Sequence, residues 1–252
     1  MLKARVMPCL LLRNEGLVKT VRFKDSTYVG DPVNAVRIFN EMEVDELIFL
    51  DILASREGRE PPYKVIEELA GECFMPLTYG GGVKTVGQMK RLFSIGVEKV
   101  AVNTAAWEDP SLIGEAAALF GSQALIGSID AKRTIFGKYE VVVRDGGKRT
   151  GLDPAEYART LEKQGAGEIL ITSMDRDGTW EGYDLELVRR VAGAVNLPVI
   201  AAGGAGSVED IGRVIREGHA SAAALGSMVV FQAKGLGVLI KFPRQDDLAR
   251  VI

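Results

Sequence analysis

Tyr79-Gly80-Gly81-Gly82 begins the stretch of sequence that decides the fold. A helical pattern and the strand-like run Lys99–Asn103 follow it, and the chain repeats this whole arrangement once. The second copy is Ala202-Gly203-Gly204-Ala205-Gly206, a helical pattern, and then Ala222–Gly226. The beginnings of the two halves also align, with Arg5–Leu11 lying over Ala124–Asp130. The chain is therefore two similar halves, and Leu11 stands in the first where the second has the carboxylate Asp130.

Short apolar runs alternate with amphipathic stretches along the chain, which is the pattern of repeated strand and helix units. Eight of the runs fit strands, and eight such units predict an α/β fold, a TIM (β/α)8 barrel built from two half-barrels. No linker interrupts the pattern, so residues 1–252 are expected to form one domain. The predicted strands are Ala4–Leu12, Glu46–Ile52, Pro76–Tyr79, Lys99–Val102, Ala124–Asp130, Glu168–Thr172, Pro198–Ala201 and Ala222–Leu225.

Several helices have a recognisable start. Asp caps free N–H groups and Pro suits the first helical turn, so an Asp-Pro pair predicts a helix N-terminus. Ser207 with Asp210 resembles a capping box. The Asp-Pro pairs are Asp31-Pro32, Asp109-Pro110 and Asp153-Pro154.

The longest connections, residues 13–31 and 131–152, follow the first and fifth predicted strands. Tyr139–Val143 is expected to form one arm of a short hairpin in the second of them. The loops after the strands form the active face of a TIM barrel, so these two connections predict a lid or a substrate clamp.

The composition excludes several classes of protein. A net charge of −3 gives no broad positive field for a nucleic-acid backbone. No apolar run approaches the roughly 18 residues of a membrane span, and the N-terminus has no apolar signal-peptide core. Cys9 and Cys73 lie in apolar runs, so we expect buried, reduced thiols and a cytoplasmic protein.

Each half carries a glycine-rich phosphate cradle. Glycines let backbone N–H groups approach an anion, and the helix that follows adds the positive end of its dipole. Two cradles at matching places predict a ligand with two phosphate groups, whereas a single one would more simply be a tight turn. The predicted cradle residues are Gly81, Gly82, Asn103 and Thr104 in the first half, and Gly203, Gly204, Gly226 and Ser227 in the second.

Asp130 is the best candidate for an acid or base, because it ends an apolar strand and should point into the mouth of the barrel. Asp51, at the end of the second predicted strand, and Asp177 are weaker candidates, and turn chemistry alone also explains the Asp177-Gly178 pair. His219 is expected at the surface. One histidine and two separated cysteines supply neither a Ser-His-Asp triad nor a zinc ligand set, so we expect no metal and no cofactor.

At the other end of the barrel, four charged residues stand where an apolar plug would be usual. Four charged residues lie at the starts of predicted strands, so their side chains could form a ring across the lower opening: Arg5, Glu46, Lys99 and Glu168. Such a ring is either a structural ion-pair layer or a gate, and the charges alone favour neither.

The chain resembles the HisF family, the cyclase subunits of imidazole glycerol phosphate synthase, over nearly its whole length. The matching segments include Phe49–Ile52, Asn103–Ala106, Ile129–Arg133, Gly165–Leu170, Asp175–Thr179 and Gly203–Gly206. The resemblance implies a ribulosyl bisphosphate nucleotide precursor at the top face, with Lys19 and Thr172 among the binding residues. It also implies a HisH-like glutaminase at the bottom face, and ammonia passing a gate of Arg5, Glu46, Lys99 and Glu168, with Gln123 near the path.

Leu11 departs from that family, which has a catalytic aspartate at this place. Leucine exchanges no proton, and the loss of a positioned acid costs about 10²- to 10⁴-fold, which argues against cyclase activity. Pro8–Leu12, Val21–Asp31 and Gly71–Pro76 resemble instead the HisF-like paralogue of glycosyl amidation, the WbuZ type. This resemblance implies ammonia delivery to an N-acetyl sugar amidotransferase that makes surface-polysaccharide sugars. An authentic cyclase and a phosphosugar isomerase of the related half-barrel family are the alternatives.

Overall fold

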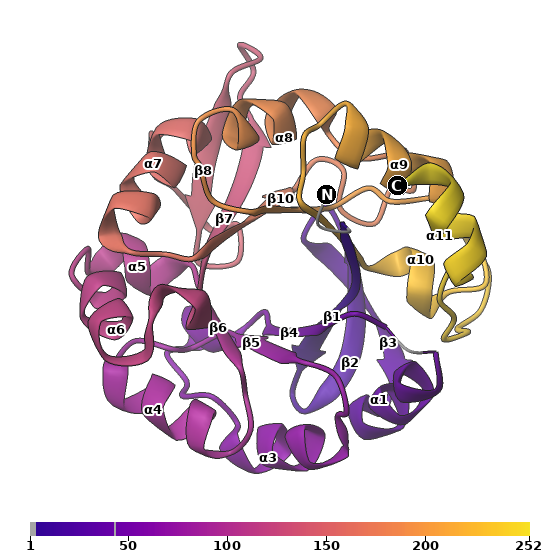
Figure 1. The fold of residues 1–252 in the computed structure, drawn as a ribbon, viewed down its shortest axis with the longest axis horizontal. Coiled ribbons are helices and arrows are strands. Elements are labelled where there is room, and N and C mark those ends of the chain that lie inside the picture. The colour runs from indigo at the N-terminus through magenta and orange to yellow at the C-terminus, as the bar shows by residue number, and fades with distance from the viewer. Residues whose placement is uncertain (1–3, 43) are drawn as a thin grey trace.

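A computed structural model describes residues 4–42 and 44–252. Eight parallel strands close into a barrel in which β1 pairs with both β4 and β12, and β7 with both β6 and β10 (Figure 1). The fold predicted from the sequence, a TIM barrel, is therefore confirmed. The barrel strands are β1 (Arg5–Arg13), β4 (Leu47–Asp51), β5 (Leu77–Gly80), β6 (Lys99–Val102), β7 (Leu125–Arg133), β10 (Glu168–Ser173), β11 (Val199–Ala202) and β12 (Ala222–Leu225).

The strand bounds differ from the predicted ones mainly at the ends. Strands β6 and β12 match exactly, whereas β7 continues three residues beyond Asp130 because it pairs with a further strand, β8 (Tyr139–Val143). Strands β5 and β11 begin one residue after Pro76 and Pro198. A proline has no N–H to donate, but both prolines use their carbonyls, which accept from Leu47 and Ile169 at 2.9 and 3.0 Å.

Helices surround the barrel and bury their apolar stripes against it (Figure 1). The caps at Asp31, Asp153 and Ser207 are confirmed, since each side chain accepts from N–H groups of the first turn. The helices are α1 (Pro32–Glu41), α2 (Ala54–Glu57), α3 (Tyr63–Glu72), α4 (Val86–Ser94), α5 (Thr104–Glu108), α6 (Leu112–Phe120), η1 (Ser122–Ala124), α7 (Pro154–Gln164), α8 (Leu185–Ala192), α9 (Val208–Arg216), α10 (Ser227–Val230) and α11 (Gln245–Val251).

The helix start predicted at Asp109-Pro110 is wrong. Helix α6 begins at Leu112, and the Asp109 carboxylate instead accepts from the Ser111 amide at 3.0 Å and the Ser111 hydroxyl at 2.8 Å. The Asp side chain folds onto its own loop, a turn that competes with capping.

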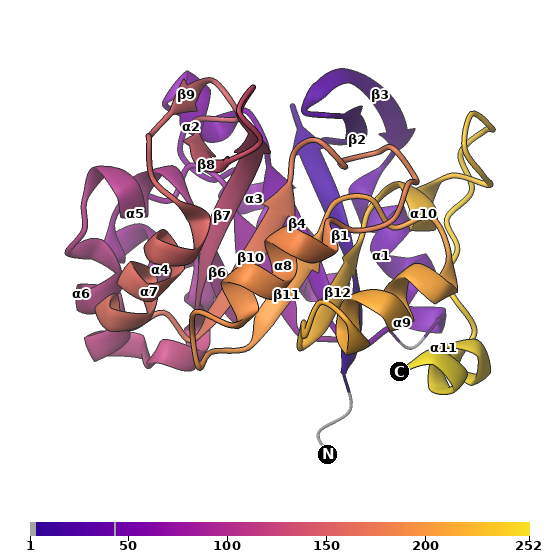
Figure 2. The same ribbon diagram turned by 90° about the horizontal axis from the view of Figure 1, so that it is seen from above.

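Two hairpins extend the barrel upward. Residues 13–31 hold β2 (Gly16–Val21), which pairs with β1, and β3 (Lys24–Gly30), which pairs with β2. The predicted hairpin arm is β8, and its partner is the short β9 (Lys148–Arg149). Figure 2 shows both hairpins at the end of the barrel where the parallel strands finish. Both long connections therefore stand over the predicted active face.

The barrel has an outer and an inner core. The outer core fills the space between strands and helices, and the inner core lies on the barrel axis. Cys9 is buried in the inner core as a free thiol. Cys73 is also free but only half-buried, so the prediction of two buried thiols holds for Cys9 alone. No helix within the described residues is both long and apolar enough to span a bilayer.

Candidate functional site

A cavity opens at the carboxyl ends of the barrel strands, where TIM barrels carry their active sites. Every residue that the sequence assigned to this end lines it. Leu11 also lines it, so the leucine does face the place where the second half presents its acid. The assigned residues are Lys19, Asp51, Gly81, Gly82, Asn103, Thr104, Asp130, Thr172, Asp177, Gly203, Gly204, Gly226 and Ser227.

The first glycine cradle lies between β5 and α4. Gly81 has φ 120°, and a β-carbon there would stand 2.5 Å from the Asp51 carbonyl oxygen, so only glycine fits. The side chains after β6 are already engaged. Asn103 Nδ2 donates to Asp130 Oδ2 at 3.0 Å, and Thr104 Oγ1 accepts from the Arg144 amide at 3.0 Å.

The second cradle combines the loop after β11 with the end of β12. A short helix, α10, begins at Ser227 directly after Gly226. Lys19 reaches this corner from β2, where its Nζ atom donates to the Cys9 carbonyl at 3.2 Å. Lys19 as a whole residue is 5% exposed and lines the cavity, so its ammonium can contact a ligand only from inside the cavity.

Asp130 is held in conditions that favour its neutral form. Burial and the nearby Asp145 carboxylate raise the pKa of Asp130 to about 7, although hydrogen bonds from Thr172 and Asn103 oppose the shift. A carboxyl group with a pKa near 7 can give or take a proton at neutral pH.

Asp145 is a pocket residue that sequence reasoning missed. It lies in the turn between β8 and β9 and lines the cavity beside Asp130. Burial raises the pKa of Asp145 to about 6, against the attraction of Arg56 and Arg13. The Asp-Gly-Gly run at 145–147 marked the turn in the sequence, but nothing local showed that the turn folds over the mouth.

The two weaker carboxylate candidates serve the scaffold. Asp51 accepts from the Leu53 and Ala54 amides at 3.1 and 3.0 Å and pairs with Arg59 at 3.2 Å. Asp177 accepts from the Thr20 hydroxyl at 2.8 Å and thereby ties the loop after β10 to the β2–β3 hairpin. Both line the cavity, but their oxygens are partly committed.

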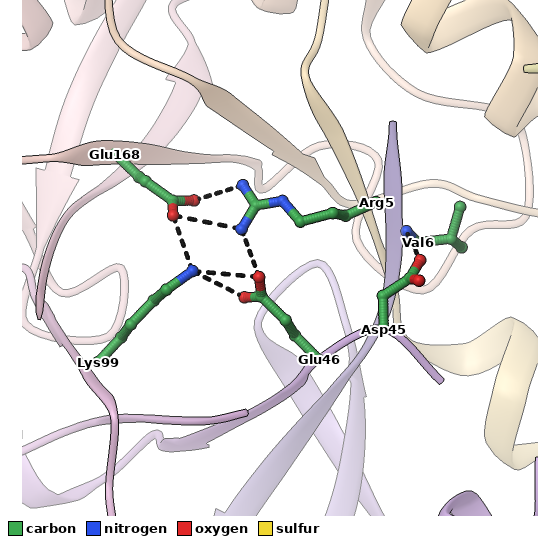
Figure 3. A network of polar contacts seen from close by, with 6 residues as sticks. All are labelled: Arg5, Val6, Asp45, Glu46, Lys99 and Glu168. Atoms are coloured by element: carbon green, nitrogen blue, oxygen red, sulfur yellow. Dashed lines mark hydrogen bonds and ion pairs between the residues drawn. The ribbon is translucent and has the colours of Figure 1, made fainter. Parts of the chain in front are cut away.

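At the bottom of the barrel, the four charged residues form a closed ring (Figure 3). Arg5 donates to Glu46 at 2.5 Å and to Glu168 at 2.7 Å, and Lys99 donates to the same two carboxylates at 2.9 and 2.8 Å. Burial alone would raise the pKa of Glu168, but the hydrogen bonds from Arg5 and Lys99 outweigh it and lower the pKa. In this arrangement the ring covers the lower opening.

Between the ring and the mouth, the axis is lined by small and apolar side chains. Among the described residues, no charged side chain belongs to this part of the axis, between the ring and the cavity. The inner core consists of Met7, Cys9, Ile48, Ala101, Ile126, Leu170, Ile200, Ala202, Ala222 and Ala224. Burial raises the pKa of the Cys9 thiol to about 11, so this thiol stays neutral.

Two other residues that the sequence singled out are exposed at the surface. Gln123 is exposed and donates to the Phe120 carbonyl at 3.2 Å, and no hydrogen bond among the described residues joins it to the ring. His219 is exposed, as predicted. Within residues 4–42 and 44–252, no group of three or more His, Cys, Asp or Glu is placed to hold a metal ion.

Comparisons with known proteins agree with this architecture. The profile of the family described as "Histidine biosynthesis protein" matches residues 5–234. A Pseudomonas aeruginosa protein named "Putative imidazole glycerol phosphate synthase subunit hisF2" is 52% identical, covering 98% of this chain and 99% of its own. A Vibrio vulnificus protein similarly named hisF3 is 45% identical over 100% of this chain and 97% of its own. "Imidazole glycerol phosphate synthase subunit HisF" from Alkaliphilus metalliredigens is 47% identical over 90% of both chains.

Proposed function

The chain belongs to the histidine biosynthesis protein family and is HisF-like, and from this premise we propose that it is the ammonia-receiving subunit of a glutamine-dependent complex. A HisH-like glutaminase binds the bottom face and releases ammonia there. The ammonia passes the Arg5, Glu46, Lys99 and Glu168 ring, follows the barrel axis, and meets a phosphorylated ligand at the mouth.

The observation that carries the proposal is the closed ring beneath an axis of small and apolar side chains. A layer needed only for closure would be served as well by packed apolar residues, because buried ion pairs gain little net stability. Neutral ammonia could move along an uncharged axis of this kind, and a change in the ring's salt bridges would open its lower end.

Exposed apolar side chains near the ring support a partner at the bottom face. Phe74, between α3 and β5, is 86% exposed, and Leu119, near the end of α6, is 68% exposed. Both precede the start of a barrel strand and so lie at the ring end of the barrel. Aromatic side chains such as Phe are enriched at the cores of protein interfaces.

For the acceptor of the ammonia, we propose a sugar of a surface polysaccharide, aminated by an N-acetyl sugar amidotransferase. The support is Leu11, which lines the cavity where a cyclase of this family has its first acid. The second candidate is an authentic cyclase that makes imidazole glycerol phosphate. It is favoured by the two glycine cradles and by the second carboxylate, Asp145, in the same cavity.

One experiment separates the two acceptors. The protein is given the ribulosyl bisphosphate nucleotide precursor with ammonium chloride, alongside its Leu11→Asp variant and a Leu11→Asn control of equal size. The sugar proposal predicts no imidazole glycerol phosphate from the wild type, together with an amidated sugar when glutamine, a HisH-like glutaminase and a sugar amidotransferase are added. Cyclase turnover by the wild type at a rate equal to that of Leu11→Asp would contradict the sugar proposal.

A further inference from the structure

Four carboxylates line the cavity, and two of them, Asp130 and Asp145, do not hold segments of the fold together. Asp51 and Asp177 accept the backbone and side-chain hydrogen bonds described above. Asp130 accepts side-chain hydrogen bonds from Thr172 and Asn103, and no hydrogen bond or salt bridge among residues 4–42 and 44–252 engages the Asp145 carboxylate. Asp145 therefore presents an uncommitted carboxylate to the cavity.

The turn that carries Asp145 is fixed over the mouth. The Arg144 amide donates to Thr104, and the Arg144 guanidinium donates to Glu108 at 3.0 Å. Lys148 Nζ lies 4.3 Å from the centre of the Trp107 ring, a cation–π contact. These contacts tie the hairpin to α5, so Asp145 is a positioned group.

Asp130 and Asp145 come from adjacent parts of the same sheet extension. Strand β8 pairs antiparallel with β7, and Asp130 lies opposite Val142, three residues before Asp145. After burial, the Asp145 carboxylate has the largest effect among the groups that raise the pKa of Asp130. Asp177 acts on both in the same sense, whereas Arg13 from the end of β1 and Arg56 from α2 favour the ionised form of Asp145.

We propose that Asp145 is the second acid/base group of this mouth, supplied by the β8–β9 turn in place of the acid that Leu11 removes from β1. The proposal rests on the proposed function, because it takes ammonia arriving along the axis as the nucleophile. Near neutral pH one of the two carboxyl groups can carry a proton while the other is ionised, so the pair can divide the roles of acid and base.

The step that this pair serves is addition of ammonia to the carbonyl carbon of a phosphorylated ligand. A nitrogen–carbon bond forms as the carbonyl π bond breaks, and its electron pair moves to oxygen. The ionised carboxylate takes one proton from the nitrogen, and the protonated carboxyl gives its proton to the oxygen. The product is a neutral carbinolamine, and the pair returns to one shared proton by exchanging roles.

The first readout is a carbon-13 NMR titration of the aspartate carboxyl carbons in the full chain. Asp145→Asn keeps the side-chain shape and the left-handed backbone at this residue, where φ is 54°. The matched control is Asp25→Asn, at an exposed residue of β3 with φ 46° that does not line the cavity. We expect Asp145→Asn to lower the titration midpoint of Asp130 and Asp25→Asn to leave it unchanged.

The second readout belongs to the cyclase candidate and is turnover of the ribulosyl bisphosphate nucleotide precursor with ammonium chloride. Asp145→Asn should lower kcat about 10²- to 10⁴-fold, as Asp130→Asn should, and Asp25→Asn should not. If Asp145→Asn leaves the titration midpoint of Asp130 unchanged, the proposed acid/base pair is wrong. It is also wrong if Asp145→Asn leaves the turnover unchanged. If the wild type does not turn over this precursor, the cyclase candidate fails, and the titration alone decides the pair.

Discussion

Lys19 and Gly226 share one corner of the cavity, because a β-carbon at Gly226 would lie 2.5 Å from the Lys19 Nζ atom. The side chain of Lys19 ends there, held by the Cys9 carbonyl at 3.2 Å. The absence of a side chain at Gly226 is therefore what lets the ammonium reach the second glycine cradle.

Gly226→Ala should displace the Lys19 ammonium without unfolding the chain. The clash falls on the flexible end of a lysine, and Gly226 has a negative φ of −102°, which alanine adopts. A displaced charge-assisted contact should weaken binding of inorganic phosphate about tenfold, measured by phosphorus-31 NMR titration. Gly71→Ala, where an added β-carbon meets nothing within 4 Å, is the control. Equal phosphate affinity in both variants would contradict this assignment of Lys19.

Asp130→Asn should stabilise the protein at alkaline pH. The pKa of Asp130 is raised to about 7 in the folded state, so the folded protein binds the proton more tightly than the unfolded chain does. Stability is therefore lost as the pH rises from about 4 to 7 in the wild type, and the variant avoids this loss. We expect the free energy of unfolding of the variant, measured with urea, to exceed that of the wild type by on the order of 1–3 kcal/mol at pH 8 and by almost nothing at pH 4. A gain that does not depend on pH would contradict the raised pKa.

Glu168→Gln should show the opposite dependence. The pKa of Glu168 is lowered by Arg5 and Lys99, so its contribution is present above its ordinary pKa and is lost as the pH falls through the folded-state pKa. The free energy of unfolding of the variant should be about 1–3 kcal/mol lower than that of the wild type at pH 7, and the difference should be smaller at pH 3. This magnitude lies between the costs of breaking an exposed and a buried ion pair. Glu72→Gln, which breaks an exposed pair with Arg37, is the control and should cost less. Thermal unfolding at pH 7 and pH 3 tests this, and an equal loss at both would contradict it.

The barrel could be predicted from sequence because its signals are local and repeated. Each buried strand is an apolar run, as in Ile169–Ile171, and each half repeats the glycine cradle at the same place. These apolar runs also predicted where the strands begin and end. The predicted ends placed Asp130 at the mouth and Glu168 at the ring.

The β2–β3 hairpin and the second acid could not be predicted in the same way. Strand β3 is mostly exposed, so it has no apolar run, and Arg22 and Phe23 adopt the turn with positive φ although neither is glycine. Asp145 reaches the cavity only because Arg144 and Lys148 dock the turn on α5, and contacts between distant segments leave no periodic pattern in the sequence.

The central claim is that a glutaminase acts through the ring end of this barrel, and glutamate release by a HisH-like glutaminase tests it most directly. The rate of glutamate release is measured for the glutaminase alone, and then with the wild-type chain, with Phe74→Asp and with Ile135→Asp. Ile135 is 94% exposed on the β7–β8 connection, away from the ring. We predict at least tenfold stimulation by the wild type and by Ile135→Asp, and its loss with Phe74→Asp. No stimulation by the wild type, or equal stimulation by all three, would contradict the account.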